Sequence, residues 1–207
     1  QFASSAASDV YKRQFLYFRI KNSGGDRRFH TIRNSFPTFF MTWTLQGAWV
    51  YLTSCAALAA VTSSNTVGLD AMFFVGFGIW AFGFAIEVIA DRQKTVFRAD
   101  PDNADKFIKT GLWAWSRHPN YFGEILLWAG IAVMAYPALV GWQALTLLAP
   151  IWVVLQMTAI SGTRMLEARA NKTWGSDPEY QAYKKSTPLL MLWPPRKRCL
   201  LYTSPSP

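Results

Sequence analysis

The sequence has 207 residues, of which 51% are hydrophobic and only 16% are charged, whereas about 25% of the residues of a typical soluble protein are charged. Its formal net charge of +9 could indicate a nucleic-acid-binding surface, but the distribution of the charges excludes that class. No Asp, Glu, Lys or Arg occurs from Ser35 to Leu69 or from Ile125 to Thr163, and a helix needs only about 20 apolar residues to span a bilayer. We therefore predict an all-α, multi-pass transmembrane helical bundle.

Both ends of the chain resemble translated sequencing-adapter sequence, in Ser5-Ala-Ala-Ser-Asp-Val-Tyr-Lys-Arg-Gln14 and in Cys199-Leu-Leu-Tyr-Thr-Ser-Pro-Ser-Pro207. Segments of this kind are left out of fold reasoning. We expect residues 1–14 and 199–207 to be non-native tails, residues 15–198 to form the membrane domain, and the natural protein to extend further toward its N-terminus.

Four spans are predicted, at residues 37–61, 71–90, 119–137 and 141–163. Pro37 is suited to the start of the first span, and Gly68 lies in the turn that leads to the second. The link from residue 137 to residue 141 is so short that the last two spans must form an antiparallel hairpin. Small residues in the second span permit close helix packing in lipid; they are Gly76, Gly78 and Gly83.

The basic residues lie on one side of this predicted bundle. Seven precede the first span, six lie between the second and third, and eight follow the fourth, which accounts for all 21. The two opposite loops contain a single charged residue, Asp70. Because positive charge marks the cytoplasmic side, we expect the basic loops and both termini to be cytoplasmic, in a bacterial plasma membrane or in the endoplasmic reticulum.

The cysteines and histidines indicate neither a disulfide framework nor a metal site. Cys55 lies within the first span and Cys199 in the predicted tail, so no framework is available. His30 and His118 are far apart and match no metal-ligand spacing. We expect no metal.

The densest group of different polar residues is Trp115-Ser-Arg-His-Pro-Asn-Tyr-Phe-Gly-Glu124. Pro119 fits a first helical turn, and a helix N-terminus presents unpaired N–H groups that bind anions. Arg117 and His118 precede that turn and suit phosphate or carboxylate oxygens, while Gly123 would let a flat ligand approach the backbone. The alternative is an interfacial anchor, because such side chains commonly lie at the headgroup level.

Two carboxylates lie within or at the edge of predicted spans, where an unpartnered charge costs several kcal/mol. Glu124 falls near Asn120 and Tyr121 on one helix at three- and four-residue spacing, which favours a functional role. Glu87 lies one turn before Asp91, so it either serves a function or simply reaches the membrane interface.

The segment Arg-His-Pro-Asn-Tyr-Phe-Gly-Glu resembles the signature of the steroid 5-alpha-reductase C-terminal domain family, in particular its bacterial-type DUF1295 branch. The resemblance covers about Gly25 to Pro194. Further matching segments are Gly25-Asp-Arg-Arg-Phe29, Glu87-Val-Ile-Ala-Asp-Arg-Gln-Lys94, Phe97-Arg98, Thr110-Gly-Leu-Trp113, Arg164-Met-Leu-Glu167, Tyr180, Tyr183-Lys184 and Pro188.

This resemblance implies a membrane-embedded reductase that uses NADPH to reduce a C=C bond conjugated to a carbonyl in a steroid-like or other lipid. We expect the protein to contact the lipid bilayer and its lipid substrate, and we expect no nucleic-acid partner. In the steroid reductases, the Glu and Tyr that polarise the substrate carbonyl lie in N-terminal helices, before the region matched here. We therefore assign the role of proton donor to no residue, and Tyr121 and Glu124 are only candidates for a catalytic role. The cofactor-binding positions implied are Asp91, Arg98, Asn120 and Glu124, with Arg117, His118, Tyr121 and Arg164 as further members.

Two other interpretations remain open. Membrane isoprenylcysteine and phospholipid methyltransferases, which use S-adenosylmethionine, are similar in an Arg-His-Pro-x-Tyr-x-Gly helix start and in a tail with Glu, spaced tyrosines and a late Pro; the matching residues are Arg117, His118, Pro119, Tyr121, Gly123, Glu167, Tyr180, Tyr183 and Pro188. The segment from Asp91 to Arg98 favours the reductases. A non-catalytic protein that binds lipid headgroups would not explain Asn120 and Glu124 together.

Overall fold

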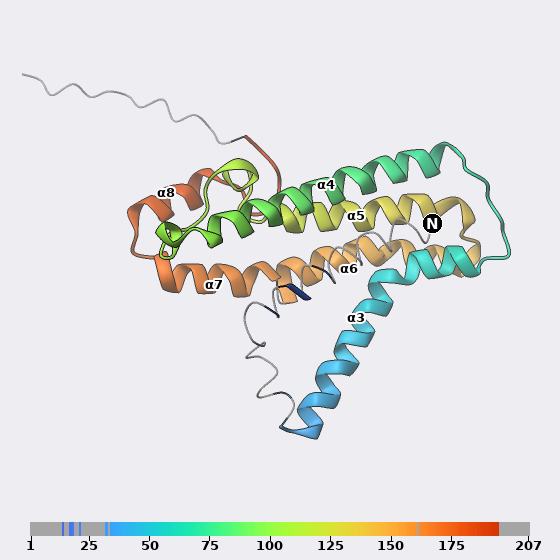
Figure 1. Ribbon diagram of the computed structural model, residues 1–207. Helices are drawn as coiled ribbons and strands as arrows, with labels where there is room; N and C mark the ends of the chain where they lie inside the picture. Colours follow the sequence, from blue (N-terminus) through green and yellow to red (C-terminus); the bar gives the residue numbers. More distant parts are fainter. Residues whose placement is uncertain are drawn as a thin grey trace, which may run out of the picture. The chain divides into compact units, whose positions relative to one another are not determined.

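A computed structural model of the chain describes residues 14, 17, 18, 21, 32, 34–160 and 162–194 (Figure 1). The predicted C-terminal tail, nearly all of the N-terminal one, and the family match at residues 25–29 lie outside the described residues. Where the chain is described, it forms helices and connecting loops without a strand. The elements are α3 (Phe36–Thr62), α4 (Ala71–Ala99), η1 (Pro101–Asn103), η2 (Gly111–Ala114), α5 (Pro119–Ala135), η3 (Tyr136–Ala138), η4 (Gly141–Leu148), α6 (Ala149–Leu155), the π-helical η5 (Gln156–Ile160), α7 (Gly162–Trp174) and α8 (Pro178–Ser186).

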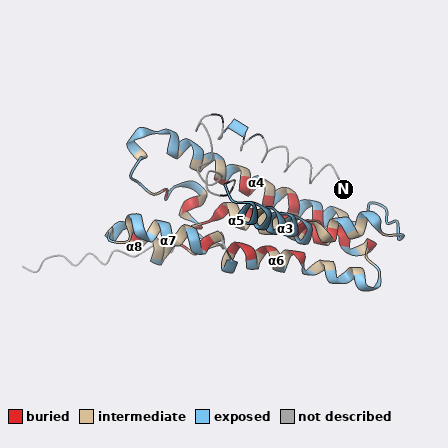
Figure 2. Cartoon of the chain, turned by 90° about the horizontal axis from the view of Figure 1, so that it is seen from below, coloured by how far each residue is buried: buried red, intermediate tan, exposed pale blue. Residues whose placement is uncertain are grey.

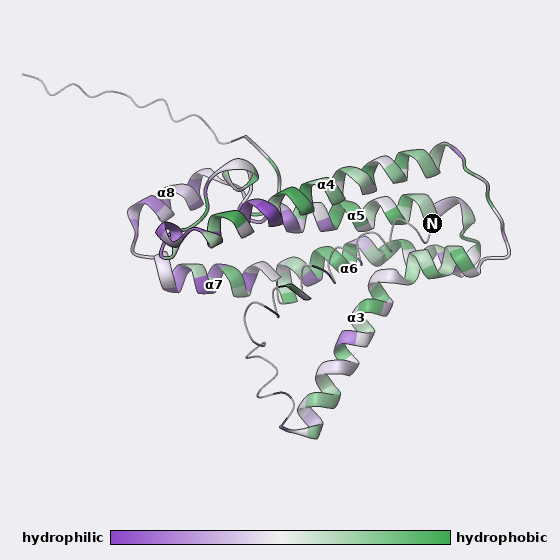
Figure 3. Cartoon of the chain, viewed as in Figure 1, coloured by the Kyte–Doolittle hydropathy of each residue, from purple (hydrophilic) through white to green (hydrophobic). Residues whose placement is uncertain are grey.

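Four helices of the described chain are long and apolar enough to cross a membrane: Phe36–Thr62, Ala71–Ala99, Pro119–Ala138 and Gly141–Trp174. Figure 2 shows that many residues of these helices are exposed, and Figure 3 shows that the helices are largely hydrophobic. Soluble monomers rarely expose contiguous apolar patches larger than a few hundred Å², so these surfaces are suited to lipid. The predicted all-α transmembrane bundle is confirmed, and the chain is an integral membrane protein. Exposed examples are Phe36, Phe40, Leu45, Phe74, Phe82 and Ile151.

The chain divides into two compact units, the first of which contains residues up to Trp80 together with Trp128–Val153. Here α3 packs through Ala56 against Ala135 and Ala149. The α4 and α5 segments of this unit approach closely, because a Cβ atom on Gly76 would lie 2.7 Å from the carbonyl oxygen of Gly130. The predicted use of small residues for packing is therefore confirmed at Gly76.

The second unit contains residues Ala81–Leu127 and the chain from Val154 onward. Its α4 segment continues beyond the span predicted to end at Ala90, and the helix ends at Ala99. The residues after Ala90 include no Gly or Pro until Pro101, and good helix formers such as Arg, Gln and Lys sustain the helix. Asp100 adopts an extended conformation before Pro101, as the proline ring requires of its predecessor.

The last predicted span is irregular. It begins as the 3₁₀ helix η4, becomes α-helical at Ala149, and passes through the π-helical segment before α7. Pro150 lacks an N–H group and fits the first turn of an α-helix, which explains why α6 starts at Ala149. Helix α7 then extends to Trp174, well beyond the predicted end at residue 163, and hydrophilic residues recur along it (Figure 3).

Candidate functional site

Two glycines bring α4 and α5 into backbone contact in the second unit. A Cβ atom on Gly83 would lie 2.6 Å from the carbonyl oxygen of Gly123, and a Cβ atom on Gly123 would lie 2.6 Å from that of Gly83. Any side chain at either position would collide with backbone. Gly123 therefore serves helix packing, and the prediction that it leaves room for a flat ligand is wrong.

This close approach places Asp91 of α4 beside Asn120 of α5. The Asn120 side-chain amide donates a hydrogen bond to Oδ1 of Asp91 across 3.2 Å, and we call these residues the Asp91–Asn120 pair. Oδ1 of Asn120 is buried and has no hydrogen-bond partner among the described residues. A buried acceptor of this kind is unusual in a folded protein, and it would suit a ligand donor such as an amide or a hydroxyl group.

The remaining polar candidates lie on α4, α5 and α7 or directly before α5. Glu124 is partly buried one turn further along α5. The ring of Tyr121 stacks on that of His118, with 5.6 Å between centroids. Glu87 is only 5% exposed, so it does not reach an aqueous boundary. Arg164 is exposed and donates to the carbonyl oxygen of Ala159 across 3.2 Å, so it does not join the other predicted residues.

The carboxylate of Glu167, on α7, joins the start of α5 to the tail of the chain. One oxygen forms an ion pair with the Arg117 guanidinium, and the other lies 3.1 Å from Nε2 of His118. Lys184 of α8 lies 3.9 Å from the first oxygen. These four residues form the Glu167 network. Arg117 and His118 are thus brought together as predicted, but Glu167 already occupies both side chains.

The backbone ahead of α5 is also engaged. The N–H groups of Arg117 and His118 donate to the carbonyl oxygens of Pro188 and Leu189 across 2.9 and 3.1 Å. The two N–H groups directly before the start of α5 are therefore not available to a ligand. The segment after α8 acts as a strap that fixes the Arg-His-Pro turn, and the hydroxyl group of Ser116 strengthens it by donating to Leu190 across 2.9 Å.

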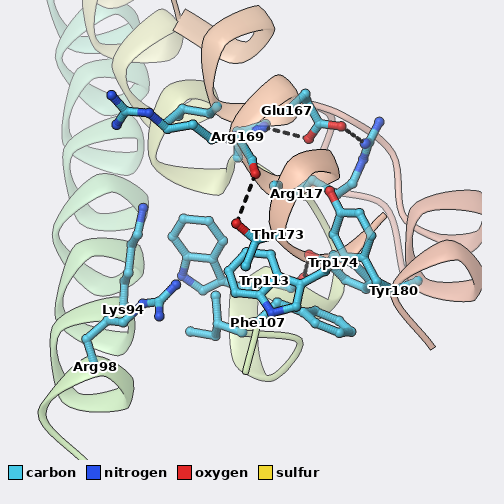
Figure 4. Close-up of a pocket in the computed structure, with 15 residues that line it drawn as sticks. Lys94, Arg98, Phe107, Trp113, Arg117, Glu167, Arg169, Thr173, Trp174 and Tyr180 are labelled. Atoms are coloured by element: carbon cyan, nitrogen blue, oxygen red, sulfur yellow. Dashed lines mark hydrogen bonds and ion pairs between the residues drawn. The ribbon is translucent and has the colours of Figure 1, made fainter. Parts of the chain in front are cut away.

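A cavity of about 320 Å³ lies within the second unit (Figure 4). We call it the cationic pocket. Arg98, Arg117 and His118 among the predicted residues line it, whereas Asp91, Asn120, Tyr121, Glu124 and Arg164 do not. The whole lining comprises Lys94, Arg98, Phe107, Ile108, Trp113, Arg117, His118, Leu166, Glu167, Arg169, Ala170, Thr173, Trp174, Tyr180 and Tyr183.

Three cations of this pocket form no ion pair with any carboxylate in the described chain: Lys94, Arg98 and Arg169. Aromatic rings position two of them, since the Lys94 ammonium lies 5.0 Å from the centre of the Trp113 ring and the Arg98 guanidinium 5.8 Å from that of Trp174. Figure 4 shows the Arg169 side chain reaching from α7 toward α4. These ring contacts hold the two cations at the pocket wall, and cations outside any ion pair suit an anionic ligand.

The loop between α4 and α5 forms one wall of the cationic pocket and is tied down at several points. The indole N–H of Trp113 donates to the carbonyl oxygen of Ala90 across 3.0 Å, and Gln93 accepts a hydrogen bond from the Leu112 amide across 3.0 Å. Gly111 makes the turn with φ of 61°, a backbone conformation that favours glycine.

Helix α8 closes the pocket with two phenols. The hydroxyl group of Tyr183 donates to the carbonyl oxygen of Trp113 across 2.6 Å, and the ring of Tyr180 lies 5.2 Å from that of Phe107. Burial raises the pKa of both tyrosine hydroxyl groups above the usual value. Both phenols therefore stay neutral and add no negative charge opposite the three cations.

Sequence reasoning missed Lys94, Arg169, Glu167 and the aromatic lining as site residues. Lys94 could have been found, because it lies three residues after Asp91 and four before Arg98 and shares a helix face with both once α4 is extended. Arg169 carries no such signal, since its contribution depends on the placement of α7.

Comparisons with known proteins give the family. The profile of the family described as "Protein of unknown function (DUF1295)" matches residues 12–187. No solved structure matches the chain significantly.

Several curated proteins are similar to parts of the chain. The 3-oxo-5-alpha-steroid 4-dehydrogenase 1 of Homo sapiens is 33% identical over 42% of this chain and 31% of its own length. Uncharacterized protein C594.04c of Schizosaccharomyces pombe is 25% identical over 70% of this chain and 46% of its own length. A probable O-methyltransferase of Ustilaginoidea virens is 30% identical over 44% of this chain and 37% of its own length.

The matched part of this chain thus spans less than half the length of each of these relatives. The profile match, in contrast, extends over most of the chain, and the steroid dehydrogenases of several mammals recur among its relatives. The chain therefore belongs to the DUF1295 family of membrane proteins, which is related at low identity to the steroid 5-alpha-reductases.

Proposed function

We propose that this chain is the cofactor-binding part of a membrane reductase that uses NADPH to reduce a carbonyl-conjugated C=C bond in a steroid-like or other lipid. The observation that carries the proposal is the cationic pocket, in which Lys94, Arg98 and Arg169 form no ion pair with a carboxylate of the described chain. NADPH is a polyanion with flat rings, and a pocket that combines cations with aromatic walls suits both features.

The residues present fit this cofactor at both ends. Lys94, Arg98 and Arg169 would hold phosphate groups. The Asp91–Asn120 pair, with the free acceptor on Asn120, would bind neutral donors such as a carboxamide or ribose hydroxyl groups. Glu124, Tyr121 and His118 remain proposed neighbours of the cofactor, and Arg117 would act mainly by fixing the turn before α5 through the Glu167 network. A role of Arg164 in cofactor binding is proposed from the family resemblance alone.

When bound, NADPH would supply the hydride for the reduction. The residues of this chain bind and orient the cofactor, and the ordered turn before α5 keeps Asn120 at the α4 contact. Tyr121 and Glu124 are the proposed proton-donor candidates. We further propose that the basic side of the bundle faces the cytoplasm, in a bacterial plasma membrane or the endoplasmic reticulum.

A methyltransferase is the second candidate, because one relative is a probable O-methyltransferase. S-adenosylmethionine carries a sulfonium and an ammonium group against a single carboxylate, so its net charge is positive. The three cations around the pocket that form no ion pair would repel it. The charge of the pocket therefore favours the reductase.

The two candidates are separated by titrating the detergent-purified chain with NADPH and with S-adenosylmethionine, with isothermal titration calorimetry as the readout. We expect saturable binding of NADPH that weakens with added salt and is reduced in Arg98→Ala and Asn120→Ala. Binding of S-adenosylmethionine without binding of NADPH would refute the reductase and support the methyltransferase.

A further inference from the structure

The π-helical segment η5 interrupts the last membrane-crossing helix near its middle. That helix extends over Gly141–Trp174, and η5 occupies Gln156–Ile160. A Cβ atom on Gly162 would collide with the carbonyl oxygen of Met157, so any side chain at this position would force η5 to change shape. Single π-helical turns within α-helices are rare, and they occur frequently at functional sites.

Two side chains that follow η5 stabilise its geometry. The Thr163 hydroxyl group donates to the carbonyl oxygen of Thr158 across 3.5 Å, and the Arg164 guanidinium donates to that of Ala159 across 3.2 Å. Each donor lies five residues after its acceptor, which is the spacing of a π-helix. The wide turn is therefore held by specific contacts, and it fixes the direction of the side chains that it carries.

Gln156, the first residue of η5, has a buried amide whose hydrogen-bonding atoms are unused. Its exposed fraction is 1%, and neither Nε2 nor Oε1 has a hydrogen-bond partner among the described residues. Eight residues, or about 12 Å of helix, separate it from Arg164, the next charged residue along the chain. The amide therefore lies within the apolar part of the span, where an unpaired polar group is costly. Glutamine in a span usually bonds a neighbouring helix, and Gln156 makes no such bond within the described chain, so its amide suits a ligand.

The Glu167 network sets the distance between Gln156 and the proposed cofactor residues. Glu167 contacts His118, which lies two residues before Asn120. Gln156 lies 11 residues before Glu167, which corresponds to about 16 Å along the helix. The Gln156 amide is thus more than about 10 Å along the bundle from the Asp91–Asn120 pair. It is too far away to touch a ring held by that pair, but a rigid multi-ring lipid bound against the ring could reach it.

We propose that the Gln156 amide binds a keto or hydroxyl oxygen at the end of the lipid substrate opposite to the C=C bond, and that it selects lipids by this oxygen. This inference rests on the proposed function, which puts the reacting end of the lipid at the cofactor. Nε2 would donate to a keto oxygen, and Oε1 would accept from a hydroxyl group. A site built to bond such an oxygen rejects an analogue that lacks it, because the buried amide then stays unpaired.

The test compares two steroid enones, androst-4-ene-3,17-dione and androst-4-en-3-one, which differ only in a keto oxygen at the end far from the C=C bond. Binding of each enone to the whole chain in detergent is measured by microscale thermophoresis, and NADPH is titrated into the same preparation. The unmodified chain should bind the dione about 3- to 30-fold more tightly than the mono-ketone. Gln156→Leu should abolish this preference by weakening only the binding of the dione, and it should leave NADPH affinity unchanged.

Two further variants define the site. Gln46→Leu, the same substitution at an exposed residue of α3, is the matched control and should retain the preference for the dione. Gly162→Ala should weaken the preference, because η5 has to change shape, and a full preference in this variant would overturn the part assigned to η5. Gln156→Leu should also raise the melting temperature by about 2 °C or more, because it removes a buried amide that has no partner.

Equal affinity of the unmodified chain for the two enones, binding of neither, or a preference that survives Gln156→Leu would overturn the inference. A lower melting temperature of Gln156→Leu would overturn it as well, because the amide would then serve the fold through a buried water. Each of these results leaves the reductase proposal standing when NADPH binds. In contrast, a preference that depends on Gln156 in a chain that binds no NADPH would support the lipid site and refute the reductase.

Discussion

The carboxylate of Glu167 lies 3.1 Å from Nε2 of His118, although 49 residues separate the two in sequence. This contact, together with the ion pair from the same carboxylate to Arg117, ties α7 to the turn that begins α5. Because His118 in turn stacks on Tyr121, the position of the first turn of α5 depends on a residue of the tail.

Replacing Glu167 with Gln removes the charge that compensates Arg117, whose side chain is 14% exposed. We expect a loss of about 1–3 kcal/mol in the free energy of unfolding, because a largely buried guanidinium is left without its counter-charge. Unfolding in detergent monitored by tryptophan fluorescence measures it. The control is Glu179→Gln, which breaks the exposed pair with Lys109 and should cost no more than about 0.5 kcal/mol. Equal effects of the two variants would show that the Glu167 network does not stabilise the fold.

The contact between α4 and α5 predicts a difference between two glycines of one helix. Gly83→Ala places a Cβ atom 2.6 Å from the Gly123 carbonyl oxygen, whereas Gly78 has nothing within 4 Å. Gly83→Ala should destabilise the protein by about 1–3 kcal/mol through forced separation of the helices, and Gly78→Ala should be neutral or stabilising by up to about 1 kcal/mol. Thermal unfolding of both variants in one detergent makes the comparison. A neutral Gly83→Ala would contradict the close approach.

Comparing two glycines with positive φ separates the energetic cost of backbone strain from the cost of a steric clash with a neighbouring side chain. Gly111 has φ of 61° and Gly141 φ of 58°, so alanine at either position costs about 1–2 kcal/mol of strain. At Gly111 the new Cβ would also lie 2.6 Å from the Gln93 amide, which accepts the Leu112 hydrogen bond. We expect Gly111→Ala to be the more destabilising and to weaken NADPH binding as well, because the wall of the cationic pocket shifts. Unchanged NADPH affinity in a folded Gly111→Ala variant would argue against that wall as part of the site.

An added negative charge at the Asp91–Asn120 pair should weaken the binding of NADPH. Asn120→Asp replaces the amide donor with a second carboxylate beside Asp91, which introduces repulsion and removes the hydrogen bond of 3.2 Å. NADPH affinity should fall by about tenfold or more. Asn171→Asp is the matched control, because it adds the same charge at an exposed position next to Lys184 and should leave affinity unchanged. Equal affinity of both variants would remove Asn120 from the cofactor site.

The membrane fold could be predicted because hydropathy is a local property of the sequence. Uncharged stretches are recognisable without knowledge of packing, and Pro37 and Pro119 mark helix starts by their fixed φ. The end of the second helix is harder to predict, since the residues change from apolar to charged at Asp91 while the helix continues to Ala99. The π-helical segment at Gln156–Ile160 has no sequence signal of its own.

The site could be predicted only where its residues are neighbours in sequence. Arg117 and His118 can be recognised as adjacent polar residues at a helix start, but the role of Glu167 depends on the placement of α7 against that turn. The same is true of Arg169 in the cationic pocket and of Pro188, whose carbonyl oxygen accepts the Arg117 amide hydrogen bond. Contacts between residues that are 50 to 70 positions apart produce no periodic pattern in the sequence from which they could be predicted.

Hydrogen–deuterium exchange of the purified chain with and without NADPH, and with S-adenosylmethionine in parallel, tests most directly whether this unit is an NADPH site. Ligand binding slows exchange where it stabilises the native backbone. The account predicts that NADPH slows exchange at residues 91–120 and 166–183, which carry the Asp91–Asn120 pair and the cationic pocket, and that S-adenosylmethionine does not. Slower exchange there with S-adenosylmethionine alone would contradict it.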